Sequence, residues 1–296
     1  MIMGSFFSVT LFAATLNIEV RQPVDDEKAA EIVEWVQSTA DSMKLVYGRF
    51  PNPNALIIVI PSSENGWDSD SPVTFGRVTR SNGETVELFV NPDRPIDEYY
   101  SDWTATHEFS HLMLPLLDQR YRWISEGFAT YYQNVLMSRS ERYTPEFAWQ
   151  RLTEGFVRGR ESRPDLSPND AASGGIGQAR MKVYWSGAAI ALMADIELRK
   201  RSGGNESLDL ALDHLQLCCL PANRRWTGPE LFEKLDSFVS SPVFMPLYRQ
   251  YANNDGFPDL GPLLQDLGVS THQDGTVSLD DSKPLAELRA AISTAQ

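Results

Sequence analysis

The pattern of apolar and polar residues in the first third of the chain predicts a mixed layer of strands around one helix. Apolar residues recur at helical spacing between residues 25 and 47, and acidic residues stand at the start of this segment. The runs on either side of Ser81-Asn82-Gly83 are expected to form a hairpin. This layer should end near Pro95. One or two strands are predicted at residues 6–20, and further strands at 56–60, 73–80 and 84–90.

Beyond this layer the apolar spacing becomes helical. A single helix is predicted from 97 to 114, because apolar and aromatic residues recur there at steps of three and four. Ser125 is expected to cap the next helix, from 126 to about 138. Residues 160–180 are rich in Pro, Ser, Asp and Gly and should form a surface loop. Further helices are predicted after the caps Thr144-Pro145 and Thr227-Gly228-Pro229-Glu230, and at residues 181–201, 207–217, 243–251, 260–267 and 285–292.

This change of pattern predicts an α+β fold in two parts. Residues 1–95 would form an N-terminal α/β subdomain, and residues 96–296 a helical subdomain. Small residues, among them Gly187 and Ala191, follow one face of the helix predicted at 181–201. They should let another helix approach that face closely.

The composition excludes some classes of function. A net charge of −14 argues against a nucleic-acid partner, which would require basic patches. No apolar run reaches the roughly 18 residues that a membrane span requires. The segment Met1 to Leu16 is apolar enough for a signal peptide but lacks a basic beginning, so we favour a first strand and leave the compartment open. Cys218 and Cys219 are adjacent, and we expect two small apolar side chains in a buried helix rather than a disulfide framework.

The candidate chemistry begins at His107-Glu108-Phe109-Ser110-His111, an H-E-x-x-H motif in a chain with only four histidines. Two imidazoles one helical turn apart share a face and can bind one metal ion. Zn²⁺ accepts neutral imidazole nitrogens, and its catalytic sites use three protein ligands and keep one position for water. Glu108 would act as the general base and then carry the proton to the leaving amine. The alternative is a buried, hydrogen-bonded pair of histidines without a metal.

Two residues further along the chain could complete such a site. Glu126 follows a crossing that is short enough to bring a second helix against the first, and we expect it to be the third zinc ligand. Asp118 competes for this role from within the crossing. Tyr184 stands near the start of a helix, where a half-buried packing role is the simpler interpretation. Near a metal, its phenol would supply a donor to a developing oxyanion.

These motifs resemble those of the gluzincin zinc metallopeptidases, and among them the chain is most similar to the glycyl aminopeptidase family. The resemblance covers nearly the whole chain, weakly before residue 95 and well after it. It is carried by His107-Glu108-x-x-His111, Trp123-x-Ser125-Glu126-Gly127-Phe128-Ala129-x-Tyr131-Tyr132, Tyr184-x-x-Gly187, Asp195-Ile196-Glu197-Leu198-Arg199, Gly203-Gly204-x-x-Ser207-Leu208-Asp209 and Pro284-Leu285-x-x-Leu288-Arg289.

The resemblance implies a thermolysin-like fold, with an N-terminal α/β layer packed on a mainly helical domain and one Zn²⁺ between them. It implies His107, His111 and Glu126 as zinc ligands. It also implies Glu108 as the base and Tyr184 as the oxyanion donor. An edge strand from the hairpin at residues 74–90 would align an extended peptide above the metal.

The expected function is therefore a zinc-dependent peptidase, with aminopeptidase action favoured over endopeptidase action and a peptide as the partner. The chain departs from the large alanyl aminopeptidase family, since its crossing from His111 to Glu126 is shorter and the Gly-x-Met-Glu-Asn motif has no match. Two rival functions are a zinc-bound but inactive peptide-binding scaffold and a zinc hydrolase of non-peptide substrates. The side-chain preference of the substrate and the oligomeric state do not follow from the sequence.

Overall fold

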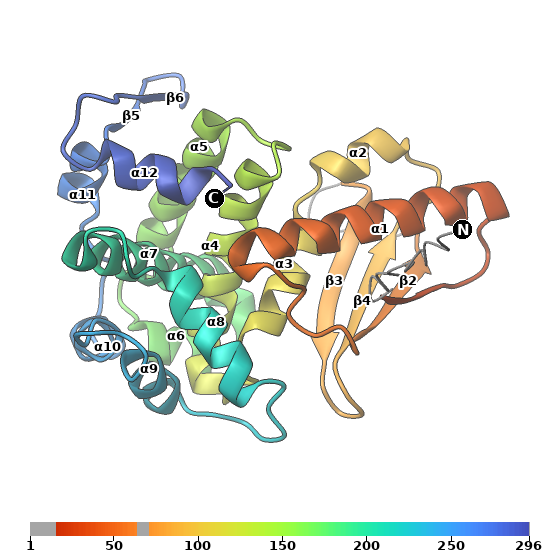
Figure 1. The fold of residues 1–296 in the computed structure, drawn as a ribbon, viewed down its shortest axis with the longest axis horizontal. Helices are drawn as coiled ribbons and strands as arrows, with labels where there is room; N and C mark the ends of the chain where they lie inside the picture. The colour runs from red at the N-terminus through yellow and green to blue at the C-terminus, as the bar shows by residue number, and fades with distance from the viewer. Residues whose placement is uncertain (1–15, 64–70, 296) are drawn as a thin grey trace, which may run out of the picture.

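A computed structural model of the chain describes residues 16–63 and 71–295. Most of the strand predicted at residues 6–20, and nearly all of the segment considered as a signal peptide, lie outside these ranges. The described chain is a mixed α+β structure in which a small sheet lies at one end and a group of helices at the other (Figure 1). Buried apolar residues from both ends form one hydrophobic cluster. No helix among the described residues has the length and apolar character needed to cross a membrane.

The larger sheet has the strand order β1-β2-β4-β3. Strands β1 (Asn17–Val20), β2 (Leu56–Pro61) and β4 (Thr85–Val90) are parallel. Strand β3 (Val73–Thr79) is antiparallel to β4, so the predicted hairpin is confirmed. Because β3 has a single neighbour, it is an edge strand of the described sheet.

Helix α1 (Asp26–Tyr47) confirms the predicted first helix and runs along the sheet towards the helical end (Figure 1). Asp25 caps it by accepting the backbone N–H of Lys28, and Gly48 ends it with a φ of 81°. Its apolar stripe, including Trp35 and Met43, is fully buried. This helix therefore fastens the strand layer to the rest of the molecule.

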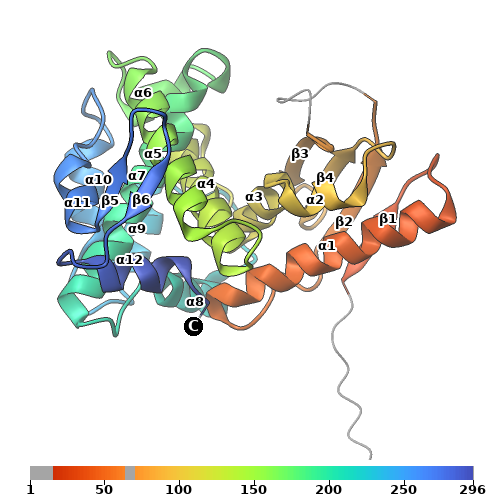
Figure 2. The ribbon, with the colours of Figure 1, turned by 90° about the horizontal axis from the view of Figure 1, so that it is seen from above.

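The prediction of one helix from 97 to 114 is wrong. The chain forms α2 (Ile96–Ser101), α3 (Thr104–Ser110) and a 3₁₀ turn at His111–Met113. The break lies at Asp102, whose backbone is extended and whose Oδ1 accepts the N–H of Thr104 at 2.7 Å. A short acidic side chain that bonds to a nearby backbone N–H competes with helix continuation and starts a new helix instead. Figure 2 shows α3 lying between the sheet and α4.

The second half of the chain is mainly helical, as predicted, and the caps expected at Thr144 and Thr227–Glu230 are confirmed. Ser207 caps the helix that was predicted at 207–217. Helix α4 begins at Arg122, four residues earlier than predicted, so Ser125 lies in its first turn and is not its cap. The helices are α4 (Arg122–Arg139), α5 (Pro145–Glu161), α6 (Pro168–Ser173), α7 (Ile176–Ser202), α8 (Leu208–Cys219), α9 (Gly228–Asp236), α10 (Phe244–Tyr251), α11 (Gly261–Asp266) and α12 (Ala286–Ser293), with a 3₁₀ turn at Gln119–Tyr121 before α4.

Helices α4 and α7 pack against each other at two glycines. A Cβ on Gly127 would lie 2.1 Å from the Cα of Gly187, and a Cβ on Gly187 would lie 2.0 Å from the carbonyl oxygen of Trp123. Both distances are far below any real contact, so only glycine permits this approach. The close helix contact expected from the small residues of 181–201 is thus confirmed, and it fixes α7 against α4.

Three further expectations need correction. The loop predicted at 160–180 contains α6, and Ser167 caps this helix. Asn169 of α6 accepts a hydrogen bond on Oδ1 from the buried indole Nε1 of Trp123 at 2.8 Å. The C-terminal part also contains a small antiparallel sheet of β5 (Val269–Thr271) and β6 (Val277–Leu279). Cys218 and Cys219 are disulfide-bonded to each other, and Cys218 is exposed because it lies on the outer side of the end of α8.

Candidate metal centre

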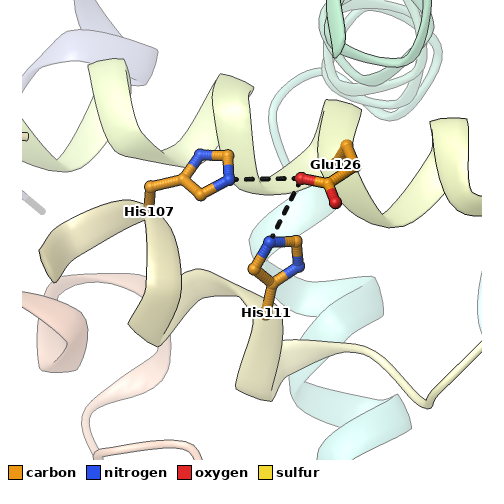
Figure 3. A group of neighbouring side chains, drawn as sticks. All are labelled: His107, His111 and Glu126. Carbon is orange, nitrogen blue, oxygen red and sulfur yellow. Dashed lines mark hydrogen bonds and ion pairs between the residues drawn. The ribbon is translucent and has the colours of Figure 1, made fainter. Parts of the chain in front are cut away.

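The elements bring three candidate ligands together at one buried point. Helix α3 carries His107, the following 3₁₀ turn carries His111, and the second turn of α4 carries Glu126. The Nε2 atoms of both histidines lie 3.4 Å from Oε2 of Glu126. Figure 3 shows this oxygen facing both imidazoles. One ligand atom from each residue lies within 4.8 Å of the others, as binding to one metal ion requires.

A hydrogen bond at the second ring nitrogen orients each imidazole. Nδ1 of His107 lies 2.9 Å from Oε1 of Gln133, and Nδ1 of His111 lies 3.0 Å from Oγ of Ser125. An amide oxygen can only accept, so Nδ1 of His107 donates this hydrogen bond, and in the neutral imidazole Nε2 is left with its lone pair. This is the tautomer that binds a metal through Nε2. Ser125 therefore orients the imidazole of His111 and does not cap α4.

The donor set fits Zn²⁺. Two imidazole nitrogens and one carboxylate are ligands that this ion prefers, and three protein ligands leave a fourth position free. Asp118, the competing third ligand, is exposed in the crossing and is not part of the cluster. Among the described residues, no other group of three His, Cys, Asp or Glu side chains meets the same distance condition.

Glu108 lies against the edge strand of the sheet. A Cβ on Gly76 in β3 would lie 2.5 Å from Cγ of Glu108, so the strand backbone passes directly beside this side chain. Glu108 is buried, and no described residue forms a hydrogen bond with its carboxylate. Its oxygens are therefore available to a water molecule or a substrate at the metal centre.

The charges at the centre shift the pKa values of its side chains in different directions. Burial acts to raise the pKa of Glu126, but the charge of His111 and the hydrogen bonds from both imidazoles hold it well below its usual range. Burial also acts to lower the pKa of His107, and the hydrogen bond with Glu126 and the nearby carboxylates outweigh it and raise that pKa. For Glu108, burial prevails over the two histidines and raises the pKa. Glu126 is thus kept ionised, as a ligand must be, and Glu108 gains proton affinity, as a base requires.

Tyr184, in the first half of α7, stacks on His107. The two rings lie 5.7 Å apart between centroids and are inclined by only 10°. Burial, together with the charges of Glu126 and Glu108, raises the pKa of Tyr184 well above its usual value, although Arg122 opposes this shift. Its phenol therefore stays protonated and can donate a hydrogen bond.

Three residues that the sequence analysis did not consider also hold the centre. Gln133 orients His107 from α4, seven residues after Glu126 and on the same helix face. Arg122 donates from Nε to Oε1 of Glu126 at 2.8 Å, an i,i+4 pair that could have been found from the sequence. Arg80, from the β3–β4 connection, donates to the carbonyl oxygens of His111 and Leu114 at 2.7 and 3.1 Å. No local pattern would have indicated that contact.

The comparisons with known proteins concern the fold. No family model matches the chain, and no curated protein matches its sequence. The chain is similar to an aminopeptidase N family protein from Idiomarina loihiensis, with 16% identity over 86% of this chain and 47% of that one, and a TM-score of 0.60. It is also similar to an M1 zinc metallopeptidase variant from Deinococcus radiodurans bound to Tyr-Ser-Ala, with 15% identity over 81% and 46% of the chains and a TM-score of 0.52.

A two-domain M1 zinc metallopeptidase variant bound to L-arginine gives similar values, with 13% identity over 81% and 48% of the chains and a TM-score of 0.52. The chain spans about half the length of these proteins. The similar structures are thus aminopeptidase N family and M1 enzymes. In the sequence, the short crossing from His111 to Glu126 argues against the large alanyl aminopeptidases. The closer resemblance to the glycyl aminopeptidase family stays a prediction. The chain therefore shares a fold with about half the length of these M1 zinc metallopeptidases and of the aminopeptidase N family protein.

Proposed function

We propose that the chain is a zinc-dependent peptidase in which His107, His111 and Glu126 hold one Zn²⁺. The observation that carries this proposal is the convergence of these three side chains beside Glu108, which is buried without a hydrogen-bond partner among the described residues. If His107 and His111 had only a structural role, a buried Glu108 carboxylate with a raised pKa and no hydrogen-bond partner among the described residues would serve no purpose beside them.

The residues of the chain would divide the reaction as follows. Bound zinc would supply a Lewis acid that lowers the pKa of a water and polarises the peptide carbonyl. Glu108 takes the proton from the attacking water and passes it to the leaving amine. The phenol of Tyr184 donates to the oxygen on which negative charge develops. The outer edge of β3 aligns the extended backbone of the substrate by strand addition.

We further propose aminopeptidase action and a thermolysin-like arrangement of two subdomains. Residues 1–95 would supply the edge strand and residues 96–296 the metal ligands and Tyr184. The names of the similar structures support the choice of exopeptidase, because they are an aminopeptidase N family protein and an M1 metallopeptidase bound to Tyr-Ser-Ala. Hydrolysis of peptides with a free N-terminus, and not of acetylated ones, would support this choice; equal hydrolysis of both would indicate endopeptidase action.

The substitution Glu108→Gln tests the proposal. It keeps the shape of the side chain and all three ligands, so the protein should bind one zinc per chain while kcat on peptides falls by about 10²- to 10⁴-fold. Zinc content and peptide turnover are measured on the same preparation. Glu161→Gln, an exposed residue at the end of α5, is the matched control and should behave as wild type.

The rival functions give different results. Wild-type protein that binds zinc and peptides without turnover would be the inactive scaffold. Turnover of ester, epoxide or other non-peptide substrates alone would identify a different zinc hydrolase. Undiminished peptide hydrolysis by the Glu108→Gln protein would remove Glu108 from the mechanism.

A further inference from the structure

A hollow of about 380 Å³ lies where β3 and α3 begin. Its walls include Val73 at the start of β3 and Trp103 before α3. They also include Phe147 and Arg151 from the first half of α5, and Tyr143 from the turn before that helix. The rings of Tyr143 and Phe147 meet edge to face at 4.8 Å, and Phe147 is 41% exposed. The hollow therefore combines an aromatic wall with open access from solvent.

The hollow is adjacent to the candidate metal centre. Trp103 belongs to both, because it lines the hollow and its indole lies at 81° to the ring of His107, with centroids 5.8 Å apart. The same edge strand also serves both places. Gly76 lies beside Glu108, and Val73, at the hollow, is three residues earlier. Three residues of strand span about 10 Å. A peptide paired with β3 and cut at the metal would therefore reach the hollow with a residue two to four positions from the cleaved bond.

One cation of the hollow, Arg151, has no ion-pair partner among the described residues. Glu98 forms an ion pair with Arg94. Asp102 accepts the N–H of Thr104 on one oxygen and the hydroxyl of Ser71 on the other. Arg151 is half-buried and lines the hollow, yet no described residue forms a hydrogen bond or an ion pair with it. A half-buried guanidinium without an anion is costly and is suited to bidentate binding of a carboxylate.

We propose that this hollow is a subsite for a carboxylate of the peptide substrate, with Arg151 as the anion-binding residue. The inference rests on the proposed function, because the peptide must lie along β3 to reach it. The chain as a whole has a net charge of −14 and repels anions, so a local cation is required to accept an acidic group. The carboxylate comes either from the C-terminus of a short peptide or from an Asp or Glu side chain. The aromatic wall would pack against the stem of that residue.

Kinetics on matched peptides test the inference. One pair of peptides differs only in a C-terminal carboxylate or amide, and a second, amidated pair differs only in Glu or Gln. In both series the variable group is placed one to five residues from the cleaved bond. In at least one series, wild type should show a KM about tenfold lower for the peptide with the carboxylate than for its neutral partner. This difference should appear when the carboxylate is two to four residues from the cleaved bond. The series that responds identifies the source.

The Arg151→Gln variant should lose this preference by raising KM for the carboxylate peptide to that of its neutral partner, with kcat unchanged. Arg160→Gln, an exposed arginine on the same helix and outside the hollow, is the matched control and should keep the preference. A preference that persists in the Arg151→Gln variant, or that is absent from wild type at every position, would overturn the inference.

A binding measurement separates this inference from the proposed function. Calorimetric titration of the zinc-loaded Glu108→Gln protein with the same peptides reports affinity without turnover. Tighter binding of the carboxylate peptide than of its neutral partner, together with loss of this difference in the Glu108→Gln/Arg151→Gln double variant, supports the subsite even if wild type cleaves no peptide. Equal affinities for charged and neutral peptides would overturn it, whether or not wild type is a peptidase.

Discussion

Tyr184 and Gln133 both act on His107, and their contacts explain why this imidazole has a single orientation. Gln133 holds Nδ1 at 2.9 Å, and the ring of Tyr184 stacks on the imidazole face. Arg122 similarly binds the Glu126 oxygen that does not face the histidines. His107 and Glu126 are thus each oriented by a hydrogen-bonding partner, which is the arrangement expected around a metal site.

Replacement of Tyr184 by phenylalanine should lower kcat on peptides by about 10²-fold and leave KM within a factor of about three, because the phenol donates only to charge that develops in the transition state. Steady-state kinetics with one peptide separate the two constants. Zinc content should be unchanged, since the stacked ring remains. Tyr251→Phe, on α10, is the control. An unaltered kcat would exclude Tyr184 from the reaction.

At the scale of elements, the centre depends on how β3, α3 and α4 meet. Glycine at position 76 lets the edge strand pass beside Glu108, and Arg80 ties the far end of the same hairpin to the turn that carries His111. Glycines at 127 and 187 bring α7, with Tyr184, against α4. The site is therefore built where two close contacts at glycines and one arginine hydrogen bond bring these elements together.

The substitution Gly76→Ala tests the strand contact. Its Cβ would lie 2.5 Å from Cγ of Glu108, so either the strand or the carboxylate must move. We expect kcat/KM on peptides to fall by about 10²-fold, as a displacement of about 1 Å at a catalytic group produces, while zinc binding persists. Gly177→Ala, where nothing lies within 4 Å of the added Cβ, is the matched control. Full activity of the Gly76→Ala protein would show that β3 does not set the position of Glu108.

Elements with strong local signals could be predicted from the sequence. The helix at Asp26–Tyr47, the hairpin around Ser81-Asn82-Gly83 and the capped helices follow from periodicity and turn chemistry that act within a few residues. The break at Asp102 could not be predicted, because one side-chain hydrogen bond decides it against an unbroken helical pattern. Helix α6 likewise depends on Asn169, whose partners Trp123 and Tyr248 are distant in sequence.

The candidate site could be predicted in its residues but not in its setting. His107, His111 and Glu126 were identified by type and spacing, and the structure brings their side chains together. Arg80 and Arg151 reach the region from other segments of the chain, so no spacing rule indicates them. The local pattern predicts that Ser125 is a helix cap, whereas its hydroxyl contacts His111, 14 residues away.

At the scale of the whole molecule, buried polar contacts join segments that are far apart in sequence. Arg139 of α4 binds Asp209 and the carbonyl oxygens of Leu45 and Ile292, so it connects four helices. Lys182 of α7 is fully buried and donates to the carbonyl oxygen of Gly256. Such contacts make stability depend on pH, because folding changes the proton affinity of the groups involved.

Burial lowers the pKa of Lys182 in the folded protein. Between that lowered pKa and the value near 10.4 of an unfolded lysine, the unfolded chain holds a proton that the folded chain has lost. Stability should therefore rise with pH in this window, by about 1.4 kcal/mol for each unit of lowering. Urea unfolding from pH 7 to 10 should show wild type gaining free energy of unfolding relative to Lys182→Met. Lys200→Met, at an exposed site, should follow wild type, and parallel pH curves for all three proteins would refute the expected shift.

The most direct test of the metal centre is the zinc content of the purified protein, measured together with its peptide hydrolysis before and after chelation. We expect one zinc per chain, hydrolysis that a chelator abolishes and that added Zn²⁺ restores, and loss of both metal and activity in Glu126→Ala. A protein that binds no zinc, or that hydrolyses peptides equally well after complete removal of metal, would contradict the account.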